Sequence, residues 1–313
     1  MQWKRKANAA LQRATGKRVS RAPGGETGPA GPKEPAASAS SPTAEAPAAP
    51  KPKDSSYGKV AASARPPADP ETDRLLKAPV IVLSPPRSGS TLLRVVLNSH
   101  PKLHAPHETH VRRLTVNLTT RPVVAAMEGF GHNTADIEHM LWDRILHREL
   151  VRSGKETVVE KTPSNVFVWK RLATCWPDAR FIFLMRHPMS IARSWHEGDP
   201  EKRPMEKAVP HTLKYMVALE EARQNLPGLT VRYEDMTSEP EVQTRRICEF
   251  LGIPWDPGMI SYGQKNHGDF VKGIGDWKEK IRTGTIQPGR ALPKPEEIAE
   301  ELREMCRIWG YLD

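Results

Sequence analysis

The sequence has few cysteines, few aromatic residues and no long hydrophobic run. No stretch offers the roughly 18 apolar residues that a membrane-spanning helix needs. Its three cysteines, Cys175, Cys248 and Cys306, lie far apart and form no Cys-x-x-Cys pair, which is typical of a reduced, cytoplasmic protein. Aromatic residues make up 6% of the chain, and no predicted strand interleaves them with basic residues, as single-strand binders do. We therefore expect no membrane span, no cysteine-bound metal and no nucleic-acid partner.

The first 77 residues differ in composition from the rest of the chain. Residues 1–21 contain seven basic and no acidic residues, so most of the formal net charge of +10 lies there. This segment is either a solvated tail or a short amphipathic helix that contacts an anionic membrane surface, and no signal-peptide core follows it. Residues 22–77 are rich in proline and alanine and poor in large apolar side chains, which predicts a disordered linker.

From Pro79 onward, short apolar runs alternate with longer helical patterns. The predicted strands are residues 80–83, 157–159, 180–185 and 229–232. A helix is predicted after each strand, over residues 91–98, 165–175, 189–197 and 241–251, and further helices over residues 135–152, 207–225 and 297–309. This alternation indicates one α/β domain over residues 78–313, a P-loop-like parallel sheet with helices on both faces.

The first predicted strand runs into the segment Ser84-Pro85-Pro86-Arg87-Ser88-Gly89-Ser90-Thr91, and a helix follows. Such a loop directs backbone N–H groups and the helix dipole at one point, which binds phosphate or sulfate oxygens. Gly89 lets the backbone approach the anion, and the neighbouring hydroxyl groups add hydrogen-bond donors. The segment is therefore a candidate phosphate-binding loop.

This loop lacks two features of the nucleotide triphosphatase pattern G-x-x-x-x-G-K-[ST]. Ser84 replaces the leading glycine and Ser90 replaces the lysine, while the basic group is Arg87. The strand over residues 180–185 ends in Arg186 where a magnesium-binding aspartate might stand. The pattern argues against a P-loop kinase and favours a nucleotide with an extra phosphate and no metal. A non-catalytic nucleotide-binding protein is the other alternative.

Arg186 and Ser194 lie eight residues apart in RHPMSIARS, and Pro188 opens the helix between them. An arginine at the strand end and a serine two turns into the helix can converge on a second phosphate. The bidentate guanidinium suits that task better than a lysine.

The segments PPRSGSTLL, RHPMSIARS, VRYEDM…FLG and KGIGDWK, in this order, resemble the sulfotransferases that use 3′-phosphoadenosine 5′-phosphosulfate (PAPS). The resemblance covers about residues 79–313 and is strongest to the protein-tyrosine type and related bacterial enzymes. It implies the sulfotransferase fold, PAPS as co-substrate without a metal, and a hydroxyl-bearing acceptor. The acceptor can be a glycan, a lipid or a small metabolite.

The resemblance also implies roles for individual residues. Those expected to hold the 5′-phosphosulfate are Arg87, Ser88, Gly89, Ser90 and Thr91. Those expected to hold the 3′-phosphate are Arg186, Ser194, Lys272 and Gly273. Tyr233 either lies near the adenine or is a core aromatic residue at a strand end.

For catalysis, Arg87 and Lys161 are the candidates to stabilise the leaving oxygen, because we expect Lys161 to follow its strand directly and reach the sheet edge. The resemblance favours Glu108 as the base, with His107 as the alternative. Tyrosine-type enzymes carry an arginine where this chain has His110, so tyrosine is not carried over as the acceptor. Residues 114–133 and 195–210 are predicted to shape the acceptor pocket.

Overall fold

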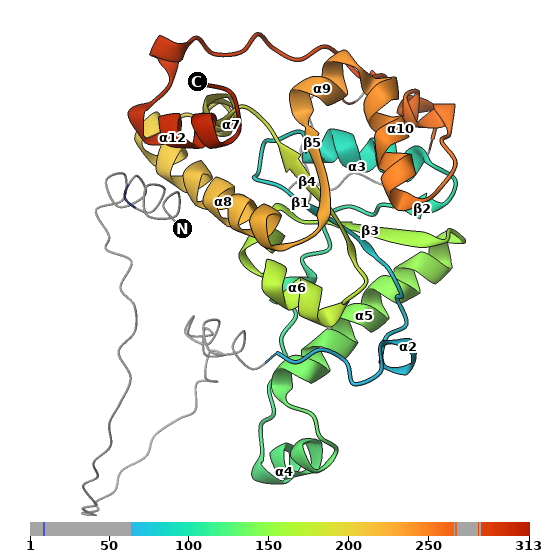
Figure 1. The fold of residues 1–313 in the computed structure, drawn as a ribbon. Helices are drawn as coiled ribbons and strands as arrows, with labels where there is room; N and C mark the ends of the chain where they lie inside the picture. Colours follow the sequence, from blue (N-terminus) through green and yellow to red (C-terminus); the bar gives the residue numbers. More distant parts are fainter. Residues whose placement is uncertain (1–8, 10–63, 266, 268–280, 282) are drawn as a thin grey trace, which may run out of the picture.

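The computed structural model describes residues 9, 64–265, 267, 281 and 283–313. Its centre is a parallel five-stranded sheet of order β2-β3-β1-β4-β5 (Figure 1). The strands are β1 (Val80–Leu83), β2 (Leu103–His104), β3 (Thr157–Lys161), β4 (Arg180–Met185) and β5 (Gly228–Arg232). The predicted parallel sheet is confirmed. The sequence analysis missed β2, whose two residues are too few to form a recognisable pattern.

β1 is central because all four of its residues are apolar and buried. A strand covered on both faces reads as a continuous apolar run, which is typical of parallel sheets. Val80 lies opposite Val159 on β3 and Arg180 on β4, so the three strands run side by side in one direction. Their carboxyl ends therefore meet at one edge of the sheet.

Helices cover both faces of the sheet, as predicted (Figure 1). On one face, α3 (Ser90–Ser99), α9 (Tyr233–Ser238) and α10 (Pro240–Leu251) pack against alternate strand residues such as Val82 and Ile182. The opposite face carries a second apolar cluster around Trp142, Trp176 and Trp309. Its helices are α5 (Thr134–Ser153), α6 (Trp169–Cys175), α7 (Pro188–His196), α8 (Met205–Asn225) and α12 (Glu300–Ile308).

Two predicted helices are divided in the structure. The helix expected over residues 165–175 is a 3-10 turn, η3 (Pro163–Phe167), followed by α6, and the one over residues 297–309 is η6 (Pro295–Glu297) followed by α12. A proline opens each turn, where its fixed φ and missing N–H are tolerated. The remaining short elements are α2 (Pro70–Asp73), η2 (Val111–Arg113), η4 (Pro257–Met259) and η5 (Tyr262–Gln264).

Residues 74–76, which composition assigned to the linker, pack onto the body. The backbone N–H groups of Leu75 and Leu76 donate to the Asp143 carboxylate, at 2.7 and 3.1 Å, and Arg74 Nε donates to the carbonyl oxygen of Cys175. Leu76 is buried in the apolar cluster of α5 and α6. The folded body therefore includes residues before position 78. The division of the chain into residues 1–21, 22–77 and 78–313 stays a prediction.

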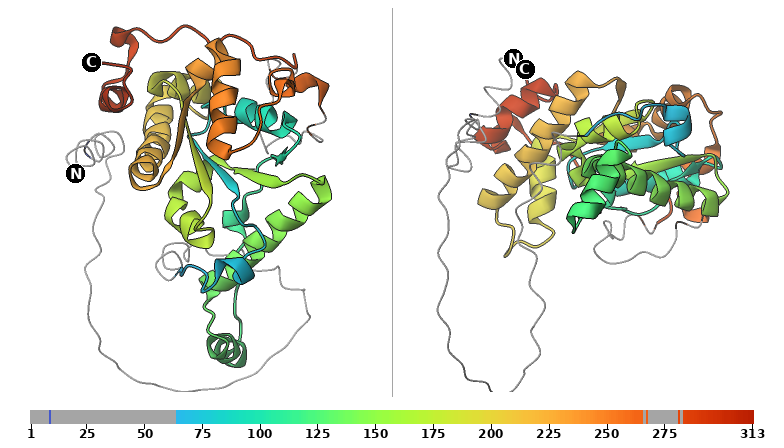
Figure 2. Two further views of the ribbon diagram at one scale, coloured as in Figure 1. Left: turned by 45° about the vertical axis from the view of Figure 1, so that its right-hand side comes forward. Right: turned by 90° about the horizontal axis from the view of Figure 1, so that it is seen from below.

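α4 (Arg121–Gly129) was not predicted and projects from the body, away from the sheet (Figures 1 and 2). None of its residues is buried, and Phe130 directly after it is exposed.

All three cysteines of the chain are buried and free. No helix in the described ranges is long and apolar enough to cross a membrane.

Candidate functional site

A cavity of about 990 Å³ opens at the carboxyl ends of the strands. Segments that follow β1, β3, β4 and β5 line it, together with residues of α7 and α8. Ligands bind at this edge in open α/β sheets because the loops that follow the strands converge there. The candidate phosphate-binding loop follows β1, and Pro86, Arg87, Gly89, Ser90 and Thr91 of this loop line the cavity.

The loop between β1 and α3 has a backbone that favours glycine. Gly89 adopts a left-handed φ of 86°, and a Cβ atom there would lie 2.2 Å from the ring of Tyr233. Both conformation and close packing therefore require glycine at this position. Arg87 is also left-handed, with φ of 69°. A non-glycine residue in this region is held by its surroundings and often marks a functional loop.

The hydroxyl groups of the loop fall into two sets. Ser90 and Thr91, in the first turn of α3, line the cavity. Ser84 and Ser88 are fully buried, and their Oγ atoms have no hydrogen-bond partner among the described residues. Buried hydroxyl groups are normally satisfied, so these two set the loop apart from ordinary buried backbone turns. Ser88 itself does not reach the cavity surface.

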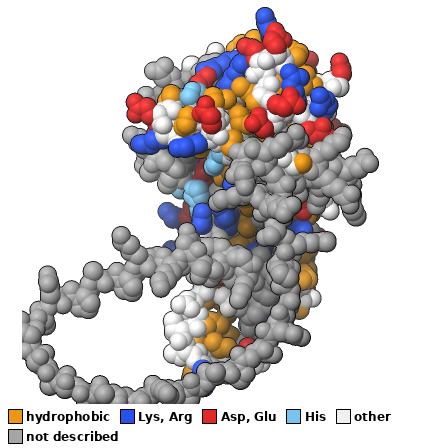
Figure 3. All heavy atoms as spheres, turned by 90° about the vertical axis from the view of Figure 1, so that its left-hand side faces the viewer, with side chains coloured by type: hydrophobic (Ala, Val, Ile, Leu, Met, Phe, Trp, Pro, Cys, Tyr) orange, Lys and Arg blue, Asp and Glu red, His pale blue; other side chains and the backbone are white. Residues whose placement is uncertain are grey.

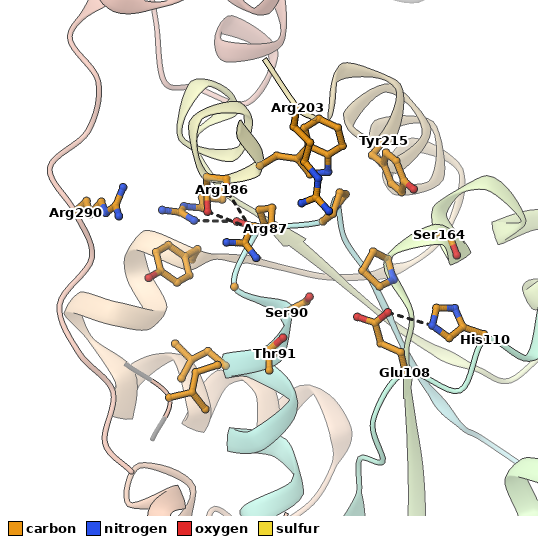
Figure 4. A pocket seen from close by; sticks show the side chains of 18 of the residues that line it. Arg87, Ser90, Thr91, Glu108, His110, Ser164, Arg186, Arg203, Tyr215 and Arg290 are labelled. Atoms are coloured by element: carbon orange, nitrogen blue, oxygen red, sulfur yellow. Dashed lines mark hydrogen bonds and ion pairs between the residues drawn. The ribbon is translucent and has the colours of Figure 1, made fainter. Parts of the chain in front are cut away.

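Arg87, Arg186 and Ser194 form one cluster rather than two separate sites (Figure 4). Arg87 Nε donates to the carbonyl oxygen and to Oγ of Ser194, at 3.1 and 3.2 Å. Arg186 Nη1 donates to the carbonyl oxygen of Arg87 at 2.8 Å. Burial lowers the pKa of Arg186 from its ordinary value, because desolvation disfavours the cation. A bound anion would stabilise that cation.

Tyr233 lies in the cavity wall, at the start of α9. Its ring packs against Gly89, and the guanidinium of Arg186 stands 4.5 Å from the ring centroid. The tyrosine therefore joins the loop after β1 to the arginine after β4. Lys272 and Gly273, also predicted for this site, lie outside the described residues.

β3 continues through Lys161, so this lysine ends the strand instead of following it. Its side chain is 1% exposed, and Nζ donates to Glu108 Oε1 at 2.8 Å. Burial lowers the pKa of Lys161, and the charge of Glu108 acts in the opposite direction. We had expected Lys161 to reach the ligand-binding edge of the sheet. Instead it does not line the cavity, and it is paired with Glu108, a carboxylate that does.

Glu108 faces the cavity and is paired through both oxygens. Oε1 meets Lys161, and Oε2 lies 3.5 Å from His110 Nε2 (Figure 4). His107 is exposed and does not line the cavity; its Nδ1 lies 3.3 Å from the carbonyl oxygen of Glu108. Of the two predicted bases, Glu108 alone lies in the cavity wall.

The rest of the cavity wall was predicted only in part. Trp195 and Arg203, within the predicted segment 195–210, line it, and the guanidinium of Arg203 stands 4.9 Å from the Trp195 ring centroid. None of the described residues that line the cavity falls within 114–133, and α4 projects away from the sheet, so the role of that segment in the acceptor pocket stays a prediction. Residues 118–128 instead line a separate hollow of about 390 Å³.

Sequence reasoning missed several residues of the wall, among them Arg112, Ser164 and Tyr215. Arg112 Nε donates to Ser164 Oγ at 2.7 Å, which joins the loop after Glu108 to the turn after β3. Arg112 follows Glu108 and Ser164 follows Lys161 within a few positions. Their closeness in sequence to these candidate residues is the signal that could have indicated them. Tyr215 lies within α8, where the sequence offers no signal beyond helical periodicity.

Arginine dominates the charge of the cavity. The described arginines in its wall are Arg87, Arg112, Arg113, Arg186, Arg203 and Arg290, and Glu108 is the only carboxylate among the described residues that line it. Arg290 Nη1 reaches Glu197 at 2.7 Å. Outside the cavity, acidic and basic side chains are mixed on the face seen in Figure 3. Within the described ranges no cluster of side chains could hold a metal ion.

The parallel sheet, the loop between β1 and α3, and the arginine-lined cavity at the carboxyl edge place the chain among the open α/β folds, which bind ligands at this edge. The sequence profile described as "Sulfotransferase family" matches residues 79–257, more than half of the chain. The chain belongs to the sulfotransferase family.

Known proteins show the same kinship. Nodulation protein NoeE of Sinorhizobium fredii is 25% identical over 228 residues, which cover 61% of this chain and 53% of that protein. Protein-tyrosine sulfotransferase A of Caenorhabditis elegans is 26% identical over 198 residues, which cover 57% and 51%. The chain thus spans about half the length of these relatives.

Two solved structures share the fold. The sulfotransferase domain from the curacin biosynthetic pathway superposes with a TM-score of 0.58 at 22% identity, and the match covers 76% of this chain and 99% of that one. The sulfotransferase domain of the Synechococcus PCC 7002 olefin synthase gives 0.53 at 23% identity, with 75% and 96% covered. The predicted sulfotransferase fold is confirmed.

Proposed function

We propose that this protein transfers a sulfuryl group from PAPS to a hydroxyl group of an acceptor. The observation that carries the proposal is one cavity with two chemically different walls. Arg87, Arg186 and Ser194 interact on one wall, and Glu108, held by Lys161, faces the same space from the other.

The donor half of the cavity consists of Arg87, Ser90, Thr91, Arg186, Ser194 and Tyr233. Arg87, Ser90 and Thr91 would bind the 5′-phosphosulfate, with the start of α3 behind them. Arg186 and Ser194 would bind the 3′-phosphate, and the Tyr233 ring would lie against the adenine. Lys272 and Gly273 remain predicted members of this half.

The residues of the donor half fit a phosphorylated nucleotide. The hydroxyl-bearing start of α3, the bare backbone at Gly89 and the arginine cluster all suit an anion. A volume of about 990 Å³ admits a nucleotide together with an acceptor group. Bound PAPS would supply the sulfuryl group.

The acceptor half consists of Glu108, His110, Ser164, Trp195, Arg203 and Tyr215. Glu108 takes the proton of the acceptor hydroxyl as the new oxygen–sulfur bond forms. The bond between sulfur and the bridging oxygen of the phosphate breaks, and its electron pair stays on that oxygen. Arg87 stabilises the resulting charge, as preorganised cations do in the related phosphoryl transfers. Lys161 holds Glu108 in place.

The two alternative functions have less support. A P-loop kinase would need a lysine where Ser90 stands and an aspartate where Arg186 stands. A non-catalytic nucleotide-binding protein would have no use for a buried lysine paired with a carboxylate in the cavity wall. Cytoplasmic location stays a prediction, and so does contact of residues 1–21 with an anionic membrane, since the structure describes only Ala9 of that segment.

Calorimetric titration with 3′-phosphoadenosine 5′-phosphate (PAP), 5′-AMP and ATP–magnesium tests the donor half. We expect a clear preference for PAP without added metal, and Arg186→Ala should abolish that preference. Preference for ATP–magnesium, or no nucleotide binding, would overturn the proposal. Labelled PAPS with a panel of hydroxyl acceptors then tests transfer.

A further inference from the structure

A buried carboxylate, Glu160, does not line the cavity but contacts the loop that carries the proposed base, Glu108. Glu160 on β3 is fully buried, and three side-chain donors reach it. Thr109 Oγ1 donates to Oε2 at 2.6 Å, while Thr162 Oγ1 and Asn165 Nδ2 donate to Oε1 at 2.7 and 3.0 Å. Both oxygens are therefore engaged, and one of the donors belongs to the loop that carries Glu108.

The loop is attached to both faces of the end of β3. Side chains alternate along a strand, so Glu160 and Lys161 point to opposite sides. Glu108 meets Lys161 on one side, and Thr109 meets Glu160 on the other. The next loop residue, His110, donates its backbone N–H to Thr162 Oγ1 at 3.3 Å. Three successive loop residues thus contact three successive residues at the end of β3.

The backbone of this loop is held in an unfavourable conformation. His110 adopts φ of 51°, a left-handed region that a residue with a Cβ enters at a cost. The same residue supplies the ring nitrogen 3.5 Å from Glu108 Oε2. A loop without outside attachment would relax and carry both side chains away from their present positions.

A buried carboxylate is a costly way to attach a loop. Burial raises the pKa of Glu160, because desolvation disfavours its charged form, and the three donors only partly offset this. Packing of apolar side chains at this position would give comparable or better stability. The carboxylate instead orients the groups around it, since its oxygens accept hydrogen bonds that have a preferred geometry.

We propose that Glu160 is a positioning residue that, through Thr109, fixes the carboxylate of Glu108 and the ring of His110 in the cavity. This inference rests on the proposed function, because it assigns Glu108 the proton of the acceptor. A displacement of about 1 Å at a reacting group can cost roughly 100-fold in rate, so the hydrogen bond between Glu160 and Thr109 controls turnover.

Thr109 offers a matched pair of variants. Thr109→Val keeps the shape of the side chain and removes the hydroxyl, whereas Thr109→Ser keeps the hydroxyl. The rate can be measured without a known acceptor, as release of labelled sulfate from PAPS when water takes the acceptor's place. Thr109→Val should lower this rate by roughly 10- to 100-fold, and Thr109→Ser should stay close to the wild type. Calorimetry with PAP should give the same affinity for all three proteins.

Glu160→Gln and the double variant with Thr109→Val test whether the two residues act through one bond. The amide has one acceptor atom fewer than the carboxylate, so the single variant should also slow sulfate release. The double variant should be no slower than Thr109→Val alone, because both changes remove the same contact. Independent, multiplicative losses would overturn the proposal.

A crystal structure of Thr109→Val with PAP gives a readout that does not depend on activity. We expect the Glu108 carboxylate to leave its position beside Lys161; an unchanged pair at about 2.8 Å would refute the positioning role. Equal loss of PAP affinity and thermal stability in both Thr109 variants would indicate a merely structural role. A wild-type protein that binds no PAP would instead reject the proposed function.

Discussion

The donor half and the acceptor half of the cavity are built in different ways. The donor half comes from short segments directly after β1, β4 and β5, and its members contact one another through backbone atoms and Gly89. The acceptor half draws on the loop before η2, the turn after β3, and on α7 and α8. In the donor half the arginine side chains bind backbone carbonyl oxygens, whereas the acceptor half is held by pairs of side chains such as Glu108 with Lys161 and Arg112 with Ser164.

This difference predicts which variants affect which half. A donor-half variant should change nucleotide affinity whatever acceptor is used. A variant in the acceptor half should change turnover and leave PAP affinity unchanged.

The largest effect should come from Glu108→Gln, which keeps the shape of the side chain and removes the base. We expect sulfuryl transfer to fall by about 100-fold or more, with unchanged PAP affinity by calorimetry. His107→Asn is the matched control, since His107 is exposed and outside the cavity wall. Equal losses in the two variants would mean that the wrong residue has been assigned as the base.

Arg186→Ala should weaken PAP binding by roughly 10- to 100-fold, the usual range for loss of a charged hydrogen-bonding group. The affinity for 5′-AMP, which lacks the 3′-phosphate, should change little. Arg186→Lys should restore only part of the affinity, because an ammonium cannot bind a phosphate in the bidentate way. An equal loss for both nucleotides would place Arg186 elsewhere than at the 3′-phosphate.

Gly89→Ala and Gly131→Ala separate close packing from backbone conformation. Both glycines have positive φ, 86° and 80°, but an added Cβ meets the Tyr233 ring only at Gly89. We expect Gly89→Ala to cost about 1–3 kcal/mol of stability and to weaken PAP binding. Gly131→Ala should show backbone strain alone and bind PAP normally. Thermal unfolding and calorimetry on both variants decide this point.

Arg203→Gln should raise the KM for an acceptor by up to about tenfold and leave PAP affinity unchanged. Its guanidinium lies over Trp195, in the acceptor half. Steady-state kinetics with each substrate varied in turn separate the two affinities. A lower PAP affinity in this variant would break the division between the halves.

The smallest effect concerns stability and pH. The pKa of Glu160 is raised in the folded protein, so ionisation of this group favours the unfolded state. As pH rises above the ordinary glutamate value toward the raised folded pKa, the wild type should lose stability relative to Glu160→Gln, which does not ionise. Thermal unfolding of both proteins across pH 4–8 measures the difference. A wild type that gains stability relative to Glu160→Gln as pH rises would contradict the sign.

The difference between the donor half and the acceptor half also explains which features the sequence could predict. The sheet order around β1 and the position of Arg87, Gly89 and Arg186 follow from contiguous motifs, because strand ends and helix starts are local features. Tyr215 and Glu160 could not be predicted, since their importance arises from distant parts of the chain: Tyr215 packs against Phe167 and lines the cavity, and Glu160 accepts from Thr109.

Lys161 shows the limit for a residue near a predicted element. The predicted strand ended at Val159, and the two further residues in β3 place the lysine under Glu108 instead of at the sheet edge. Strand ends depend on pairing with neighbours, which a single sequence does not reveal. α4 was missed because its residues pack against nothing that would impose a pattern.

The burial of all three cysteines makes the protein suitable for site-selective labelling. Burial raises the pKa of Cys175 and Cys306 to about 12 and that of Cys248 to about 11, so little thiolate forms near neutral pH. The thiolate is the reactive form, and the native thiols are therefore poor targets for maleimides or oxidants. A single cysteine introduced at Phe130, beside the projecting α4, would carry a fluorophore without prior removal of the others.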